Sequence, residues 1–164
     1  MGTEFVDIIL ERKKYMNELI EVQENDIEEM FKVVSVSEGA SLPLIRYTTT
    51  DDNVVMFNAL NSSSEKIENH LGEELNVEHI VVTAADVQEE FNNPDAPFVN
   101  KPVIHFFLDD GTHIASLANG IRRTTINLLA LGFLPTPENP ITIKFKNVKV
   151  KKGTAHGFDI IRIN

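Results

Sequence analysis

The sequence predicts a mainly β fold with helical additions, and the order of the expected elements in the last half of the chain carries this prediction. Residues 77–89 are expected to form a first strand, residues 103–109 and 112–117 a hairpin, residues 119–131 a helix, and residues 141–163 a second hairpin. The order β-β-β-α-β-β, with its one helix between strands three and four, is that of the OB-fold. We therefore expect a five-stranded Greek-key barrel.

Length and composition allow one domain with a real core. The chain has 164 residues, of which 42% are hydrophobic, and this suffices for one domain plus a modest appendage. We place the boundary after residue 43, so that residues 1–43 form an appendage and residues 44–164 the OB-fold domain. Residues 2–5 read Gly-Thr-Glu-Phe, which two adjacent restriction sites would encode, and we assign them no function.

The composition also excludes several classes of protein. The chain contains no cysteine, which excludes disulfides, thiolate zinc sites and cysteine nucleophiles. It shows no run of eighteen apolar residues and no secretion signal, so the sequence predicts a cytoplasmic protein that does not enter a membrane.

The appendage and the start of the domain show two further patterns. Apolar residues at roughly helical spacing predict one or two acidic amphipathic helices within residues 1–43. Residues 46–48 and 54–57 are rich in β-branched and aromatic side chains around an Asp51-Asp52-Asn53 turn signal, which predicts a hairpin. Residues 62–65 then supply a cap for a short turn that Gly72 closes.

Charge is distributed unevenly along the chain, whose net charge is -10. Residues 1–100 carry 6 Lys and Arg against 21 Asp and Glu, whereas residues 101–164 carry 9 against 4. Phosphate binding is driven by Lys and Arg that release condensed counterions. Only the C-terminal part of the chain is therefore suited to a polyanionic partner.

The fourth strand of the predicted barrel separates apolar from basic side chains. Side chains alternate between the two faces of a strand, so Lys144 and Lys146 point away from the face of Ile141, Ile143 and Phe145. After Asn147 the apolar positions change parity, which predicts a β-bulge in this strand. The following residues 151–157 form a basic, glycine-containing connection of the kind that OB-folds close over a bound strand.

These patterns predict a surface that binds single-stranded nucleic acid, which requires cations along the phosphates and flat side chains for base stacking. The cationic candidates are Lys144, Lys146, Lys149, Lys151, Lys152, Arg122 and Arg123, with Arg46 and Lys101 as weaker ones. The stacking candidates are Tyr47, Phe57, His105, His113, His156 and Phe158. For the single positions the alternatives stay open: a lysine on a strand also suits a solvated face, and an aromatic residue also suits the core. Phe106, Phe107, Phe133 and Phe145 are expected in the core.

Catalytic and metal-binding motifs are absent from the sequence. Asp109, Asp110 and His113 lie close together, but Asp-Asp-Gly-Thr is an ordinary hairpin turn. The five histidines show no metal-binding spacing, and the glycines form no phosphate-cradling loop. We therefore predict no enzyme, no cofactor and no metal site.

Seven segments of the chain together have an order and spacing similar to those of a known family. They are residues 56–60, 66–77, 107–112, 116–121, 132–135, 139–144 and 151–153. Over about residues 46–162 the chain resembles phage-encoded single-stranded DNA-binding proteins from phages that infect Gram-positive bacteria. The resemblance implies an OB-fold that coats single-stranded DNA in phage DNA replication or recombination, without catalysis. The acidic C-terminal tail through which bacterial single-strand binders recruit partners is missing.

A second function remains open beside DNA coating. The acidic N-terminal helices and a small barrel also suit a protein-interaction module that binds a replication, recombination or host protein. The amphipathic N-terminus equally allows a homodimer seam or packing of a helix onto the barrel.

Overall fold

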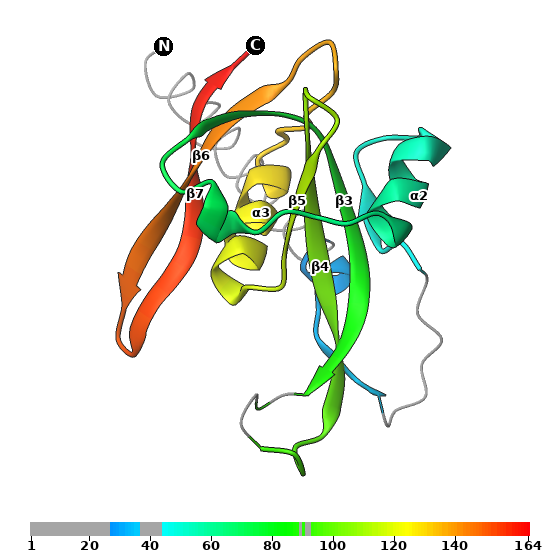
Figure 1. The fold of residues 1–164 in the computed structure, drawn as a ribbon, viewed down its shortest axis with the longest axis vertical. Coiled ribbons are helices and arrows are strands. Elements are labelled where there is room, and N and C mark those ends of the chain that lie inside the picture. The colour runs from blue at the N-terminus through cyan, green and yellow to red at the C-terminus, as the bar shows by residue number, and fades with distance from the viewer. Residues whose placement is uncertain (1–26, 37–43, 89, 91–92) are drawn as a thin grey trace, which may run out of the picture.

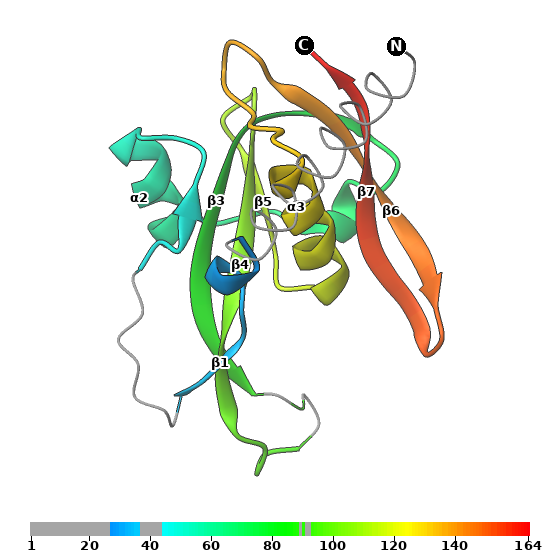
Figure 2. The same cartoon turned by 180° about the vertical axis from the view of Figure 1, so that it is seen from behind.

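A computed structural model describes residues 27–36, 44–88, 90 and 93–164 of the chain. The described part is mainly β, with all strands in one antiparallel sheet (Figures 1 and 2). The strands are β1 (Val34–Ser35), β2 (Tyr47–Thr48), β3 (Glu74–Gln88), β4 (Phe98–Leu108), β5 (His113–Ser116), β6 (Ile141–Val150) and β7 (Gly153–Ile163). The helices are α2 (Asn53–Asn61), the 3-10 helix η2 (Ile67–Asn69) and α3 (Asn119–Ala130).

The strands β3 to β7 and the helix α3 follow the predicted order β-β-β-α-β-β. The long strand β3 pairs with β4 and with β6, β4 pairs with β5, and β6 pairs with β7. No ladder joins β5 to β7 within the described residues, and α3 packs against β7 and β4. The mainly β architecture is thus confirmed, whereas a closed five-stranded barrel stays a prediction because this sheet is open.

The helix α3 fills the space beside β7 and ends in a well-defined motif. It begins at Asn119. In the segment before it, the hydroxyl of Ser116 accepts a hydrogen bond from the backbone N–H of Ala118. It ends where Gly132 adopts a φ of 87° and donates to the carbonyl of Leu129. Because Phe133 N–H also donates to the carbonyl of Leu128, the helix ends in a Schellman motif, which only a residue tolerant of positive φ permits.

The core lies between the sheet and α3. The rings of Phe106, Phe145 and Phe158 form a triad of edge-to-face pairs, with centroids 5.4, 5.5 and 6.0 Å apart. Ile121 and Leu128 of α3 are buried in the same cluster. Phe106, Phe107 and Phe145 lie in the core as the sequence predicts, and the half-buried Phe133 packs against it.

The predicted hairpin of residues 46–48 and 54–57 is wrong in its second strand. Residues 53–61 form the helix α2, because the side chain of Asp52 accepts a hydrogen bond from Val54 N–H at 2.9 Å and caps the helix. The first strand, β2, pairs with β3 instead. This local cap outweighs the β propensity of the neighbouring valines.

The predicted bulge near Asn147 is also wrong. Strand β6 pairs with β7 without a register shift from Ile143 to Val150, and the extra residue lies in β7, where Thr142 faces Arg162 and Ile143 faces Ile160. Lys149 therefore lies on the same face of β6 as Phe145. Val148 and Val150 lie on the other face, together with the candidate residues Lys144 and Lys146. Both valines are exposed, because none of the described elements covers this end of the hairpin.

The predicted appendage of residues 1–43 lies mostly outside the described residues. Within its described part, residues 27–30 are helical, Phe31 is buried in the core, and β1 pairs with β4. The predicted amphipathic helices before residue 27 lie outside the described residues. No helix among the described residues is long and apolar enough to span a lipid bilayer.

Candidate nucleic-acid interface

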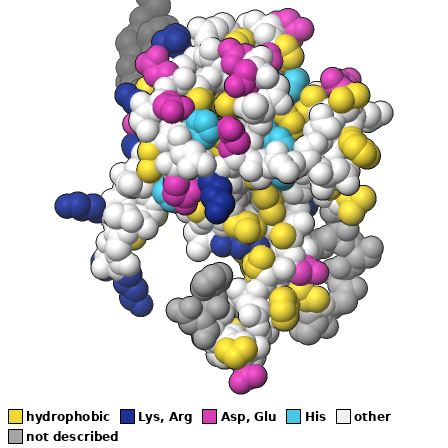
Figure 3. All heavy atoms as spheres, viewed as in Figure 1, with side chains coloured by type: hydrophobic (Ala, Val, Ile, Leu, Met, Phe, Trp, Pro, Cys, Tyr) yellow, Lys and Arg dark blue, Asp and Glu magenta, His cyan; other side chains and the backbone are white. Residues whose placement is uncertain are grey.

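The β6–β7 hairpin carries a basic, exposed tip. Phe145 is 1% exposed, whereas every residue from Lys146 to Thr154 is exposed. The two strands are joined by the turn residues Lys151 and Lys152, and Gly153 follows with a φ of 126°. The hairpin projects from the body of the molecule, and dark-blue side chains stand out along this projection (Figure 3). The tip therefore presents cations to solvent on an extended support.

The lysines of this hairpin differ in their partners. Lys146 Nζ donates to Asp159 Oδ1 at 2.6 Å across the strands, so its charge is partly neutralised. In the part of the chain that the structure describes, no ion pair engages Lys144, Lys149, Lys151 or Lys152. We name Lys149, Lys151 and Lys152 the tip lysines. These three lysines have no ion pair among the described residues and lie together at the exposed end of the hairpin.

The predicted arginines lie apart from the tip. Arg123 on α3 forms an ion pair with Glu28. Arg46 donates to the backbone carbonyl of Lys32 and to the side chain of Asn100, so it joins the N-terminal part to β4. Arg122 is half-buried, and its Nη1 atom has no hydrogen-bond partner.

Two of the predicted stacking residues pack in the interior. Tyr47 is half-buried with its ring 6.1 Å from that of Phe31, and burial raises the pKa of its hydroxyl. Phe158 is 5% exposed and belongs to the aromatic triad of the core. In contrast, Phe57 on α2 is 63% exposed. Figure 1 places α2 on the opposite side of the molecule from the β6–β7 hairpin, so Phe57 and the tip lysines form no common site.

Two of the predicted histidines form a buried pair. His105 and His113 lie on the paired strands β4 and β5, are 5% and 4% exposed, and have ring centroids 5.2 Å apart. His105 Nε2 is 2.9 Å from the hydroxyl of Thr83, and the ring of His113 stacks on Phe107. Burial and the neighbouring His113 lower the pKa of His105 to about 4, and burial also lowers the pKa of His113. The pair is therefore neutral at pH 7.

His156 is the one predicted histidine that lies beside the basic hairpin. It is half-buried on β7, with its Nε2 atom 3.5 Å from a carboxylate oxygen of Glu68. Its backbone carbonyl packs directly on Gly120, where an added Cβ atom would lie only 2.1 Å from the oxygen. The first turn of α3 is therefore pressed against β7 just behind the tip.

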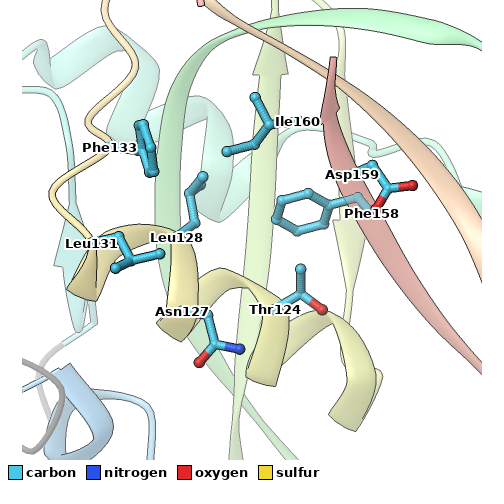
Figure 4. Close-up of a pocket in the computed structure, with 8 residues that line it drawn as sticks. All are labelled: Thr124, Asn127, Leu128, Leu131, Phe133, Phe158, Asp159 and Ile160. Atoms are coloured by element: carbon cyan, nitrogen blue, oxygen red, sulfur yellow. The ribbon is translucent and has the colours of Figure 1, made fainter. Parts of the chain in front are cut away.

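An apolar pocket of about 250 Å³ lies between α3 and β7 (Figure 4). Leu128, Leu131, Phe133 and Ile160 supply apolar walls, and Asp159 is the charged residue at its edge. A cavity without a cation and with a carboxylate does not suit a phosphate chain. We therefore do not place the DNA backbone here.

A second concave site, which the sequence did not predict as such, lies near the start of α3. It combines Lys101 of β4 with Asn119 and Arg122 of α3 and with the end of β3 at Gln88. No spacing in the sequence indicates this site because its residues come from three separate elements. The prediction for Arg122, and the weaker one for Lys101, rested on their charge alone.

The described residues hold no group of three or more His, Asp and Glu side chains that suits a metal ion. Asp110 instead accepts hydrogen bonds from the hydroxyl and the N–H of Thr112, and these bonds lower the pKa of its carboxyl group. This carboxylate belongs to a turn, as the sequence predicts.

A small antiparallel sheet with a free basic hairpin is typical of domains that bind single-stranded nucleic acid. The family model described as Phage Single-stranded DNA-binding protein matches residues 40–159. The chain belongs to this phage single-stranded DNA-binding protein family. No curated protein and no solved structure matches the chain.

Proposed function

We propose that this protein coats single-stranded DNA without catalysis and with little sequence preference, in phage DNA replication or recombination. Family membership supports single-stranded DNA as the partner. The observation that carries the proposal is the exposed group of tip lysines, which have no ion pair with any described residue, on a chain whose net charge is -10. A protein with this charge repels a polyanion on most of its surface, so attraction must come from a local group of cations.

The chemistry of the tip lysines accounts for weak sequence preference. A lysine ammonium group is a point charge on a flexible stem, so it follows a phosphate whatever base is attached to it. Each neutralised phosphate of a single strand releases counterions and contributes about 0.7 to the slope of log affinity against log salt. Binding through this hairpin should therefore be steeply dependent on salt.

The proposed contact surface is centred on the tip and extends along the hairpin. Lys144 and Lys146 line the outer face of β6, and His156 lies on β7 within the same hairpin. His105, His113 and Phe158 have no exposed ring face in this structure, so a base would reach them only after the fold opens. Phe57 is exposed, but it would contact only a strand that wraps around to α2.

The test is titration of labelled oligothymidine with the full chain at several salt concentrations. A triple variant with Lys149, Lys151 and Lys152 changed to Ala should lose about 10- to 100-fold in affinity at physiological salt, and its salt slope should fall by about 2. A matched control changes Lys32, Lys66 and Arg162 to Ala. It removes the same net charge from other exposed positions and should leave the slope nearly unchanged.

Two results would contradict the proposal. Absence of oligothymidine binding by the unaltered chain at low salt would exclude DNA coating and would favour the protein-interaction alternative. Equal losses in the triple variant and in its control would show that net charge, and not the hairpin tip, governs binding. A hairpin-specific loss that is the same for thymidine and mixed-sequence oligonucleotides would support weak sequence preference.

A further inference from the structure

The site near the start of α3 is a concave surface whose described lining residues include two cations and no anion. Its volume is about 280 Å³, and it is lined by Gln88 from β3, Lys101 from β4, and Asn119 and Arg122 from α3. Val33 and Val99 supply apolar walls. We name this site the Lys101–Arg122 pocket.

Both cations of the pocket are half-buried, and neither has a counterion among the described residues. Arg122 Nη1 is buried without any hydrogen-bond partner, although a guanidinium group has five N–H donors to satisfy. Within the described residues, the side chain of Lys101 makes no ion pair and no hydrogen bond. Burial, and secondly the positive charge of Arg122, lowers the pKa of Lys101.

Two described carboxylates on segments that adjoin the pocket, Glu28 and Asp86, are already engaged. Glu28 lines the neighbouring hollow that also contains Arg122, but its carboxylate accepts from Arg123. Asp86 accepts from the side-chain amide of Asn100, the residue before Lys101. Asn100 in turn accepts from Arg46, so a third cation near the pocket is bound to neutral oxygen atoms only.

Such an arrangement costs free energy in the unliganded protein. Two like charges that are partly removed from water repel each other, and neither is compensated by hydrogen bonds. An unsatisfied buried donor in a native structure requires an explanation, and a binding site is one of the few that apply. The N-terminal turn of α3, which has no side-chain cap, adds the positive end of a helix dipole.

We propose that the Lys101–Arg122 pocket binds one backbone phosphate of the single-stranded DNA. This inference rests on the proposed function and assigns a fixed phosphate site beside the flexible tip lysines. A phosphate diester supplies the negative charge and the acceptor oxygens that both side chains lack, and the planar guanidinium group of Arg122 suits it.

The position of the pocket allows one strand to reach both cationic regions. Gly120 packs against Ala155 and His156 of β7, and Arg122 follows two residues later in the same helix. The first turn of α3 thus lies between the β6–β7 hairpin and the pocket. A strand bound at the tip that continues past the start of α3 meets the pocket next.

The experiment uses three variants of the full chain, namely Lys101→Met, Arg122→Gln and the double variant that combines them. Arg123→Gln serves as the control. Arg123 is the adjacent residue and is exposed in an ion pair with Glu28, so its substitution removes the same charge as Arg122→Gln alone without touching the proposed contact. We expect the double variant to lose about 5- to 30-fold in oligothymidine affinity at physiological salt, with a slope reduced by about 0.7. The control should change affinity less than twofold.

Thermal unfolding supplies the second measurement. Because the pocket cations destabilise the unliganded protein, the double variant should unfold at the same or a higher temperature than the unaltered chain. Oligothymidine should raise the unfolding temperature of the unaltered chain more than that of the variant. A lower unfolding temperature together with unchanged DNA affinity would show a structural role and overturn the inference. If Arg122→Gln does not fold, Lys101→Met alone decides by the same criteria.

Inorganic phosphate separates a free anion from a backbone phosphate. Stabilisation by phosphate that is lost in the double variant supports the pocket as an anion site. If the double variant loses the stabilisation by phosphate but keeps the oligothymidine affinity of the unaltered chain, the pocket binds free phosphate and the inference about DNA is overturned. If the unaltered chain does not bind oligothymidine at all, the proposed function fails first. Binding by the unaltered chain with equal affinity in all variants overturns this inference alone.

Discussion

The tip lysines and the His105–His113 pair show two opposite fates of residues with the same predicted role. The tip lysines are exposed on a projecting hairpin and form no ion pair within the part of the chain that the structure describes. The two histidines are 5% and 4% exposed and lie on the face of the sheet where α2 also packs. Residue type suggested DNA contact for both groups, but only the first group faces solvent.

In this fold the neighbouring elements, and not the residue type, decide which candidate residues face solvent and which are buried. We therefore expect exposed candidates to affect DNA binding and buried candidates to affect stability. A substitution at the tip should change DNA affinity with little effect on unfolding, because few contacts are lost there. A substitution in the buried group should change unfolding with little effect on the affinity of the molecules that remain folded. The predictions below test this separation.

The largest expected effect distinguishes two phenylalanines that the sequence proposes as stacking platforms. Phe158→Ala should lower the free energy of unfolding by about 3–4 kcal/mol, because it leaves a cavity against Phe106 and Phe145. Phe57→Ala, at a position that is 63% exposed, should change it by less than about 0.5 kcal/mol. Urea unfolding followed by circular dichroism measures both values.

DNA titration at low temperature completes the comparison between these phenylalanines. If Phe158→Ala is still folded, it should bind oligothymidine within about twofold of the unaltered chain. A tenfold loss in the folded variant would mean that Phe158 reaches a base, and the separation of binding from stability would fail at this position.

The next effect is the dependence of stability on pH, which the buried histidine controls. The pKa of His105 is lowered from 6.5 to about 4, so the unfolded chain binds a proton at this site more readily than the folded chain. The stabilisation is therefore complete above about pH 6.5 and is lost as the pH falls toward 4. At pH 5 this amounts to about 2 kcal/mol less stability than at pH 7, and the lowered pKa of His113 acts in the same direction.

A variant without the titrating group isolates this contribution. His105→Gln keeps a polar side chain near the hydroxyl of Thr83 but binds no proton in this range. Urea unfolding at pH 7 and pH 5 should show a clearly smaller pH dependence in the variant. An equal pH dependence in both proteins would assign the acid sensitivity to other groups.

Patterns within single strands were sufficient to predict the order of the five strands and the helix α3. Ile141, Ile143 and Phe145 alternate with polar positions, and the structure buries all three. The alternation of side chains between the two faces of a strand depends on the strand alone, so it can be predicted without knowing which elements pack against the strand. The family resemblance over residues 46–162 is confirmed in the same region by the match over residues 40–159.

What the sequence could not supply was the set of neighbours around each strand. Val148 and Val150 were expected to face the core through a bulge, but no element of the described chain extends far enough to cover them. His105 was predicted as a candidate for base stacking, yet β4 is covered on that face as well. The Lys101–Arg122 pocket depends on three elements that are distant in sequence, so no local pattern indicates it.

The smallest expected effect compares two lysines of β6 that differ in their partners. Lys149→Ala should lower oligothymidine affinity about three- to fivefold at physiological salt and reduce the salt slope by about 0.7, because one proposed contact with a DNA phosphate is lost. Lys146→Ala should have a smaller effect, since Lys146 must leave Asp159 before it binds a phosphate. Neither substitution should change the free energy of unfolding by more than about 0.5 kcal/mol, because exposed ion pairs contribute little.

Asp159→Asn turns this small difference into a directional test. The substitution removes the carboxylate that holds Lys146 at 2.6 Å, so the lysine becomes as free as the tip lysines. Affinity should then rise a few fold, and the salt slope should increase by up to about 0.7. In the double variant with Lys146→Ala this gain should be largely lost. A gain that persists without Lys146 would come from the removal of one negative charge, and the partner of a lysine would not then decide whether it contacts DNA.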